Sequence, residues 1–447
     1  MKKTIKPSRK IGGTISLPGD KSIAHRAALL SILSSGPIVA HNYPAGDDCL
    51  TSIAVAREFG VAIEHAGTSV TFTPPEKRTL KGNAAIYCGN SGTSARLLAG
   101  IIAGSGLSAT ITGDDSLSRR PMKRVAEPLI RMGAEITDTD GHLPLRIHGH
   151  RLLPFEYRMP VASAQVKSAL LLAGVASGCS VRILEDSVTR DHTEIMLGAA
   201  GEGISVRDIK PVPTPDPHDP RKTRMVMPET FKREITLASR ARIVGGEIDI
   251  PGDISTAAFF FAAAAISGGT VTVTNCGLNP TRLGILEHLK AINCKVTIEN
   301  KTIVSGEARG SVTVTGGPLK ARKISGDRTV DLIDEIPVVA VMAALAEGTT
   351  LIRDASELRA KESDRIAAIA ENLNRMGVKC GLLEDGLAIE GAKELAGADL
   401  AAFGDHRIAM AFAVAALAAV GPSTLDTPEI VSVSCPNFFD LLGQVSA

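Results

Sequence analysis

The sequence has very few aromatic residues, with no tryptophan and only three tyrosines. Proteins that hold single-stranded nucleic acid stack its bases on aromatic side chains, so this chain lacks the usual platform. Its net charge is only +1, and no overall field draws it toward DNA or acidic lipid. We therefore expect no nucleic-acid partner and no membrane partner. Any anion must be bound by local clusters of cations.

Cysteines are few and scattered. The chain has seven of them, an odd number, and none forms a C-x-x-C pair. This pattern argues against a disulfide framework and a zinc site, and it is typical of a reducing compartment. The opening MKKTIKPSRKIGG is charged and has no apolar stretch, so no secretory signal is expected. We predict a cytoplasmic protein.

Long hydrophobic runs are also missing. The longest, AAFFFAAAAI and IAMAFAVAALAAV, fall short of the roughly 20 residues that a membrane-spanning helix needs. They are typical of buried helices rich in alanine. A chain of 447 residues is long enough for two to four domains with large cores.

One pattern recurs six times along the chain. An Ala/Leu-rich helix ends in glycine, which accepts a left-handed conformation, and a strand follows. A polar loop, a second amphipathic helix and another strand complete the unit. The six core helices are expected in SIAHRAALLSILSSG, SGTSARLLAGIIAGSG, SAQVKSALLLAGVASG, ISTAAFFFAAAAISGG, IDEIPVVAVMAALAEG and DHRIAMAFAVAALAAVG.

These six units predict an α/β fold of two lobes with three units each. The sixth unit is cut short, and we expect a strand within residues 3–17 to supply its missing edge. The first lobe then comprises residues 18–244, and the second comprises 1–17 plus 245–447. The proline-dense segment 210–224 is expected to be a surface loop.

A sequence segment near the start of the chain is repeated in its middle. GGTISLPGDKSIAHR at 12–26 matches GGEIDIPGDISTAAF at 245–259, but Lys21, His25 and Arg26 are replaced by apolar residues in the second copy. The second copy shows what the turn needs in order to fold, so the cations of the first point to function. Ser22 recurs as Ser255, which favours a helix-capping role for it.

Cations lie repeatedly at the expected helix starts, where the helix dipole disfavours them. Bound anions would explain this placement, because they also accept hydrogen bonds from free backbone N–H groups. Solvated surface charges and pairs with nearby carboxylates are the alternatives. The cations are Lys21, Arg26, Arg96, Arg119, Arg120, Lys123, Arg124, Arg190, His192, Lys361, Arg365, His406 and Arg407.

Two carboxylates stand beside these cations. Asp334 lies near a helix start in LIDEIP. Glu362 precedes Ile366 by four residues, so on a helix it would face inward. Inward carboxylates beside cations suit proton transfer, because neighbouring charges tune their pKa. The alternative is that both acids merely favour helix N-termini.

Seven motifs lie along the chain: LPGDKSIAHRAALL, GNSGTSARLLAG, SLSRRPMKRV, SAQVKSALLLA, TRDHTE, LRAKESDRI and GDHRIAMAFAVAAL. They occur in the order found in the 5-enolpyruvylshikimate-3-phosphate synthases, and the chain resembles that family over nearly its whole length. The resemblance implies a two-lobed inside-out α/β barrel, with three βαβαββ-like units per lobe around buried helices.

The resemblance also implies a reaction. The enolpyruvyl group of phosphoenolpyruvate moves to the 5-hydroxyl of shikimate 3-phosphate by addition and elimination, and phosphate is released. No metal or organic cofactor is implied, and we expect a monomer. This step belongs to the shikimate pathway of aromatic amino acid biosynthesis.

The family pattern assigns residues to both substrates. It implies that shikimate 3-phosphate binds to Lys21, Ser22, Arg26, Ser163, Gln165, Arg190, Asp334 and Lys361. It implies that phosphoenolpyruvate binds to Lys21, Asn90, Gly92, Thr93, Arg120, Gln165, Arg365, His406 and Arg407. Asp334 resembles the base for the 5-hydroxyl, and Glu362 resembles the group that protonates the methylene carbon.

Some positions depart from the family pattern. Ala164 replaces a serine that many members use for the shikimate phosphate, and IVSVSCP lacks a lysine found there in some members. Gly92 favours sensitivity to glyphosate, while Ala164 leaves that open. The alternatives are the related UDP-N-acetylglucosamine enolpyruvyl transferase and a non-catalytic anion-binding repeat protein. The first usually has Lys-Asn at positions 21–22 and often a loop cysteine that SLSRRPMKR lacks.

Overall fold

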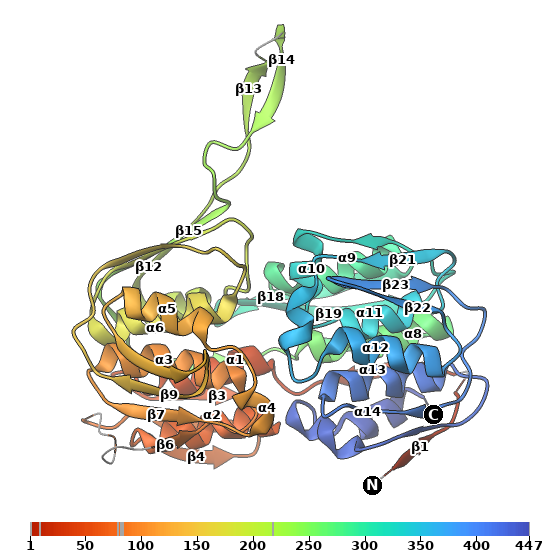
Figure 1. Cartoon of the computed structure of the whole chain (residues 1–447), viewed down its shortest axis with the longest axis horizontal. Helices are drawn as coiled ribbons and strands as arrows, with labels where there is room; N and C mark the ends of the chain where they lie inside the picture. Colours follow the sequence, from red (N-terminus) through yellow and green to blue (C-terminus); the bar gives the residue numbers. More distant parts are fainter. Residues whose placement is uncertain (1, 9, 78–79, 81–84, 217–218, 447) are drawn as a thin grey trace.

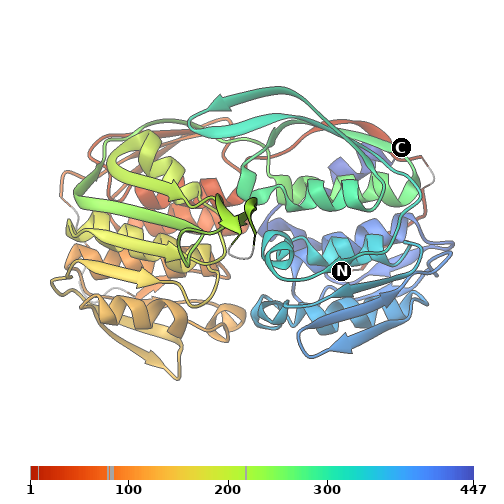
Figure 2. The ribbon, with the colours of Figure 1, turned by 90° about the horizontal axis from the view of Figure 1, so that it is seen from above.

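The computed structural model describes residues 2–8, 10–77, 80, 85–216 and 219–446. Figure 1 shows two lobes side by side, with the N-terminal colours in one and the C-terminal colours in the other. In each lobe the sheets lie outside and the long helices inside, as Figure 2 also shows. The predicted two-lobed α/β architecture is confirmed.

The first lobe contains three sheets of four strands. Their orders are β16-β3-β5-β4, β6-β7-β9-β8 and β10-β11-β15-β12. The strands are β3 (Ile38–His41), β4 (Ala62–Ala66), β5 (Ser69–Thr73), β6 (Ala85–Tyr87), β7 (Ala109–Thr112), β8 (Glu135–Thr139), β9 (His142–His148), β10 (Phe155–Arg158), β11 (Val181–Glu185), β12 (Gly201–Asp208), β15 (Arg233–Ile243) and β16 (Gly246–Asp249). The helices are α1 (Lys21–Leu30), α2 (Asp47–Glu58), α3 (Gly92–Ser105), α4 (Asp115–Ser118), α5 (Lys123–Arg131), α6 (Ala164–Ser177) and α7 (His192–Ala200).

The second lobe repeats this plan with two four-stranded sheets and one smaller sheet. Their orders are β18-β19-β17-β2, β20-β21-β23-β22 and β1-β25-β24. The strands are β1 (Lys3–Ile5), β2 (Gly12–Ser16), β17 (Thr270–Gly277), β18 (Lys295–Val304), β19 (Glu307–Thr315), β20 (Lys323–Ile324), β21 (Thr349–Ile352), β22 (Cys380–Leu383), β23 (Gly386–Glu390), β24 (Asp399–Leu400) and β25 (Ser423–Leu425). The helices are α8 (Ile254–Ser267), α9 (Gly284–Ala291), α10 (Asp327–Leu332), α11 (Ile336–Ala343), α12 (Arg365–Arg375), α13 (His406–Leu417) and α14 (Phe438–Val445), with short 3₁₀ helices η1 (Pro280–Arg282), η2 (Ser356–Ala360) and η3 (Pro428–Val433).

The five four-stranded sheets share one pairing pattern. In each sheet one edge strand pairs in parallel with its neighbour, and the other two pairs of adjacent strands are antiparallel. The N-terminal segment serves two sheets, because β1 pairs with β25 of the sixth unit and β2 pairs with β17 of the fourth. Strand pairing among the described residues gives separate sheets. These sheets surround the helices of each lobe, which is an inside-out arrangement.

The core helices are apolar on all sides, as the sequence predicted. Helix α8 has twelve buried residues among its fourteen, which is typical of a helix enclosed by protein. Glycine ends α3, α6 and α8 in the left-handed conformation. The expected glycine ending is wrong for α1, α11 and α13. There the last turn tightens through hydrogen bonds to the third preceding residue, such as Leu33 N to Leu30 O at 2.9 Å, and the helix ends earlier.

The chain passes between the lobes twice, at the two copies of Pro-Gly-Asp. At the first crossing, Leu17 lies in the core of the second lobe and Ile23 lies in the core of the first. At the second crossing, Ile250 lies in the core of the first lobe and Ile254 lies in the core of the second. The division at residues 244 and 245 stays a prediction. Because β16 completes a sheet of the first lobe, we propose to draw that boundary after Ile250.

The proline-dense segment is not the loop that we expected. Strands β13 (Val212–Asp216) and β14 (Asp219–Val226) form an antiparallel hairpin that projects away from the first lobe in Figure 1. The prolines are compatible with it because this two-stranded ribbon has only edge strands. Residues 217 and 218, between the strands, lie outside the described residues.

A glycine contact between two core helices gives a test of the packing. A Cβ at Gly100 in α3 would lie 2.0 Å from the carbonyl oxygen of Ala169 in α6. We expect Gly100→Ala to lower the free energy of unfolding by about 1–3 kcal/mol, because the helices must separate. Urea unfolding measures this. The control is Gly443→Ala in α14, where a Cβ meets nothing within 4 Å and helix propensity should add stability. Equal effects of the two substitutions would contradict the packing.

Candidate active site

A polar pocket lies between the lobes and takes residues from both. Its walls come from the starts of α1, α3, α6 and α13 and from the segments that precede α7, α11 and α12. The lining residues are Lys21, Ser22, His25, Asp48, Gly92, Thr93, Arg96, Arg120, Arg124, Gln165, Arg190, Asp253, Arg282, Asp334, Ala360, Lys361, Glu362, Arg365, His406 and Arg407.

Side-chain caps fix the helix starts around this pocket. Asp20 accepts hydrogen bonds from the backbone N–H groups of Ser22 and Ile23 at the start of α1. Ser163 caps α6 and Asp405 caps α13 in the same way. These capping residues fix where each helix begins. They therefore also fix where the positive ends of several helix dipoles lie around the pocket. The capping role expected for Ser22 is wrong, because Asp20 fills it and Ser22 is already inside the helix.

Cations outnumber carboxylates in the lining. There are nine lysine or arginine side chains and four carboxylates: Lys21, Arg96, Arg120, Arg124, Arg190, Arg282, Lys361, Arg365 and Arg407 against Asp48, Asp253, Asp334 and Glu362. Burial, followed by the charges of Arg124 and Arg120, lowers the pKa of Arg96 to about 9. Crowding of like charges is costly, so the pocket is built to receive anions.

Asp334 lies just before α11 and is surrounded by cations. Its Oδ2 lies 2.6 Å from Arg190 NH2, and its Oδ1 lies 3.5 Å from Arg365 NH1 and 3.7 Å from Lys361 Nζ. Arg407 donates to the backbone carbonyl of Asp334 at 2.8 Å. Burial alone would raise the pKa of Asp334, but the charges of Arg190 and its neighbours hold it well below its usual range. The side chain is therefore a carboxylate in the free pocket.

Glu362 is a second lining carboxylate, and it contacts the same Arg365 guanidinium as Asp334. Its Oε2 accepts a hydrogen bond from Arg365 NH2 at 2.7 Å, and its Oε1 lies 3.4 Å from Arg120 NH1 of the other lobe. Burial acts to raise its pKa, but Arg365 and Arg120 outweigh burial and keep the pKa well below its ordinary value. The prediction that a helix turns Glu362 inward is wrong, because Asp364 caps a helix that begins at Arg365. The preceding loop brings Glu362 to the pocket.

Lys21 and two histidines also line the pocket. Lys21 forms an ion pair with Asp48, and this charge outweighs the opposing effect of burial, so the pKa of Lys21 is raised. Burial, with the charge of Lys21, holds the pKa of His406 well below its usual range, so the ring is neutral. His25 Nδ1 lies 2.7 Å from Ser52 Oγ, so this side chain connects α1 to α2.

The start of α3 faces α6 across a polar contact. Gln165 donates to Thr93 Oγ1 at 3.0 Å and accepts from Arg96 at 2.8 Å. A Cβ at Gly92 would lie 2.7 Å from Arg96 NH1 and 3.4 Å from Arg120 NH1. Only glycine leaves both guanidinium groups in place.

Three of the predicted ligands do not line this pocket. The guanidinium of Arg26 is directed to Thr193 Oγ1 at 2.7 Å and Ser168 Oγ at 2.8 Å. Asn90 lies behind Arg120 and accepts its hydrogen bond. Ser163 lines an adjoining cavity, which shares Gln165, Arg190, Asp334 and Lys361 with the pocket. The other predicted site residues line the pocket together.

Comparison with known proteins identifies the family. The model of EPSP synthase (3-phosphoshikimate 1-carboxyvinyltransferase) matches residues 5–229 and 225–442. The 3-phosphoshikimate 1-carboxyvinyltransferase of Herpetosiphon aurantiacus is 42% identical over 100% of this chain and 99% of its own length. That of Shouchella clausii is 41% identical over 99% of both chains. A solved EPSP synthase from Acinetobacter baumannii matches with a TM-score of 0.80 and 37% identity, covering 100% of this chain and 98% of its own.

The chain belongs to the EPSP synthase family. The resemblance inferred from seven motifs is thereby confirmed, and membership does not favour the UDP-N-acetylglucosamine transferase alternative. None of the helices that the structure describes is long and apolar enough to cross a membrane. Among the same residues, no group of three or more His, Cys, Asp or Glu side chains is arranged to hold a metal ion.

The sequence did not assign several residues of this EPSP synthase pocket to the site. Asp48, Asp253 and Arg282 were not singled out as site residues, and Arg96 and Arg124 appeared only as cations near helix starts. Arg282 had no motif signal, because its partners Asp20 and Asp253 are distant in sequence. Asp253 could have been found in the repeated Pro-Gly-Asp, whose aspartates both cap helices.

The lowered pKa of Asp334 predicts a pH-dependent effect on stability. A carboxyl whose pKa falls on folding stabilises the protein above its unfolded pKa, near 4, and this contribution is lost as the pH falls toward the folded pKa. We expect Asp334→Asn to destabilise the unliganded protein by roughly 2 kcal/mol at neutral pH, and by less in acid. Urea unfolding at several pH values measures this. Glu299→Gln, at an exposed site without a described partner, is the control. A deficit that does not shrink in acid would contradict the role of these ion pairs.

Proposed function

We propose that the pocket binds shikimate 3-phosphate beside phosphoenolpyruvate and transfers the enolpyruvyl group to the 5-hydroxyl, with release of phosphate. Family membership and the excess of cations over carboxylates support this. Each substrate carries a phosphate and a carboxylate, which repel those of the other substrate. Holding them in attack geometry can supply roughly 7–11 kcal/mol of the barrier. The cation excess is the observation that carries the proposal.

We propose that the two substrates bind at different ends of the pocket. Ser22, Gln165 and Arg190 face shikimate 3-phosphate, with Ser163 and Lys361 at the adjoining cavity. Gly92, Thr93, Arg120, Arg365, His406 and Arg407 face phosphoenolpyruvate, and Lys21 lies between the two. Asn90 positions Arg120 through its hydrogen bond. Arg26 positions α1 against α6 and α7 through its hydrogen bonds to Ser168 and Thr193.

Asp334 is the proposed base for the 5-hydroxyl proton. In the free pocket Arg190 and Lys361 neutralise it and make it a weak base. A substrate phosphate takes over these cations, so the pKa of Asp334 rises on binding. The hydroxyl oxygen then attacks the substituted alkene carbon of phosphoenolpyruvate while its proton passes to Asp334.

Glu362 is the proposed donor to the methylene carbon in the addition step. Its proton converts the CH₂ group of phosphoenolpyruvate to CH₃ and gives a tetrahedral intermediate. In the elimination step, Glu362 removes a proton from this CH₃ as the C–O bond to phosphate breaks. Its anionic substrate neighbours compete for Arg365 and Arg120, which raises its pKa and keeps it protonated before addition.

The remaining predictions concern the setting of the reaction. The monomeric state and the cytoplasmic, reducing location stay predictions, and all seven cysteines are free thiols. Gly92 favours sensitivity to glyphosate, and Ala164 leaves that question open.

A phosphate-release assay tests the proposed reaction. We expect release from shikimate 3-phosphate and phosphoenolpyruvate together in a chelating buffer, and none with either substrate alone. UDP-N-acetylglucosamine replaces shikimate 3-phosphate in the control reaction. Turnover only with the UDP-sugar, or none with protein shown to be folded, would reject the assignment.

The role of Glu362 is tested by Glu362→Gln. We expect at least about a 100-fold lower kcat, the scale of one general acid–base group, while both substrates still bind. Isothermal titration with shikimate 3-phosphate measures binding separately. The control is Glu357→Gln, which removes a carboxylate that pairs with Lys361 and Arg124 but takes no proton in the scheme. A kcat near that of the unmodified enzyme would remove Glu362 from the mechanism.

A further inference from the structure

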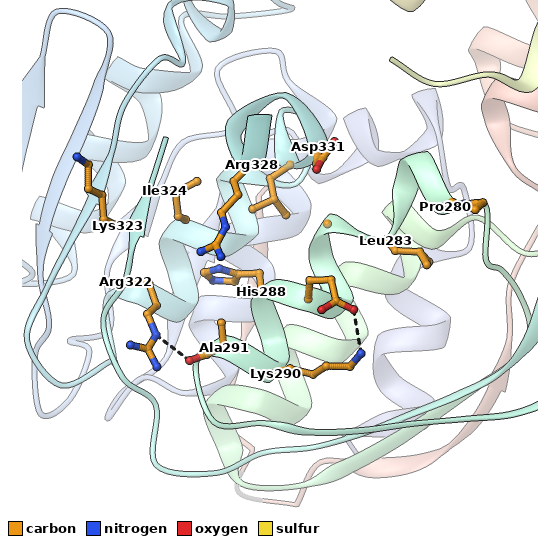
Figure 3. A pocket seen from close by; sticks show the side chains of 13 residues that line it. Pro280, Leu283, His288, Lys290, Ala291, Arg322, Lys323, Ile324, Arg328 and Asp331 are labelled. Carbon is orange, nitrogen blue, oxygen red and sulfur yellow. Dashed lines mark hydrogen bonds and ion pairs between the residues drawn. The ribbon is translucent and has the colours of Figure 1, made fainter. Parts of the chain in front are cut away.

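A second cavity lies in the second lobe, outside the pocket described above. Its volume is about 570 Å³, and its walls are α9, β20 and α10 (Figure 3). We call it the α9–α10 pocket. A volume of this size suits a small organic ligand. The lining residues come from Pro280 to Ala291 and from Arg322 to Leu332.

Cations in the α9–α10 pocket have spare hydrogen-bonding capacity. The exposed side chains of Arg328 and Lys323 form no hydrogen bond or ion pair with any other residue in the described ranges. Arg322 uses its Nε on the carbonyl oxygen of Ala291 at 2.8 Å, and its two terminal nitrogens have no described partner. Lys290 is already neutralised by Glu287 at 2.8 Å. Asp331 is the remaining carboxylate of the lining.

A buried imidazole lies between the two arginines. His288 is only 8% exposed, and its ring makes no hydrogen bond within the described part of the chain. Figure 3 shows the guanidinium of Arg328 close to this ring, with Arg322 on the side of Ala291. Burial, followed by the charges of Arg328 and Arg322, lowers the pKa of His288 to about 4. At neutral pH the ring is uncharged and is free to donate or accept one hydrogen bond.

The rest of the lining is apolar. Leu283, Ile324 and Leu332 line the pocket, and Pro280 lies at one end of it. Two guanidinium groups beside apolar side chains match a molecule with a carboxylate or phosphate on an apolar body. Inorganic phosphate alone would leave this apolar surface uncovered.

The walls of this pocket continue into the active site. Helix α9 follows η1, which carries Arg282, and Leu332 precedes Asp334 by two residues. The walls meet tightly, because a Cβ at Gly284 would lie 2.8 Å from the Cβ of Asp331. A ligand that moves α9 against α10 therefore moves the backbone that holds Arg282 and Asp334.

We propose that the α9–α10 pocket is an effector site for a small organic anion, held by Arg328, Arg322 and His288, and that its occupancy alters binding of shikimate 3-phosphate. The second part rests on the proposed function, since it requires that substrate to bind near Asp334. The first part does not depend on catalysis.

Binding is tested by NMR on the full chain labelled at its ten histidines, with phenyl phosphate and benzoate as probes. The spectrum is assigned with His288→Gln, His25→Gln and His406→Gln. With shikimate 3-phosphate saturating the active site, we expect both anions to shift the His288 signal and benzyl alcohol to leave it in place. Arg328→Glu should abolish the shift. Lys393→Glu, at another exposed cation without a partner among the described residues, should preserve it. No shift of His288, or a shift that survives Arg328→Glu, would overturn the site.

Coupling is tested by steady-state kinetics with the stronger-binding probe. We expect the KM for shikimate 3-phosphate to change by about fivefold at saturating probe, the low end of ordinary allosteric coupling. The change should vanish in Arg328→Glu, whose basal kinetics should equal those of the unmodified enzyme, and persist in Lys393→Glu. An unchanged KM while His288 reports binding, or a KM effect that survives Arg328→Glu, would overturn the coupling. Because NMR needs no turnover, an inactive protein would count against the proposed function and not against the site.

Discussion

The two lobes depend on the pairing of the chain crossings that join them. Asp20 N donates to Pro251 O at 2.8 Å, and Asp253 N donates to Pro18 O at 3.1 Å, so the two Pro-Gly-Asp copies lie back to back. Arg282 is buried between them, 3.1 Å from Asp20 Oδ2 and 3.4 Å from Asp253 Oδ1. Burial and the charge of Asp20 raise the pKa of Asp253, while Arg282 and His192 overcome burial to lower that of Asp20. One guanidinium thus holds both crossings and both helix caps.

This arrangement explains why distant motifs meet. The two crossings lead directly into α1 and α8. Figure 2 shows the long helices of the second lobe running in roughly parallel directions. Their N-termini, with the cations beside them, therefore face the gap between the lobes. The dipoles and the cations act together, since each favours negative charge at that level. Asp334 and Glu362 are the internal counter-ions that allow such a cluster to exist without substrate.

Local patterns predicted much of this molecule, and long-range contacts decided the rest. The alanine-rich runs identify the core helices because burial on all sides leaves no polar face, and the motifs gather at the pocket because they begin those helices. No local signal could show that Arg26 turns to Thr193 and Ser168, or that Arg282 joins Asp20 to Asp253. The hairpin at 212–226 was missed because five prolines across 210–224 hide its alternation. Glu362 reached the pocket by a route other than the helix we expected.

The electrostatics of the free pocket connect binding to proton transfer. Arg365 pairs with both Glu362 and Asp405, and Arg190 pairs with Asp334. Neither of the two carboxylates that we propose as reacting groups is therefore free to exchange a proton at its ordinary pKa. Substrate anions are the species that can draw these guanidinium groups away, because they carry the charge that the pocket lacks. Under the proposed mechanism, the pKa values needed for the chemistry arise only after both substrates are bound. The cations proposed to bind the substrates would then also prevent the two carboxylates from acting without them.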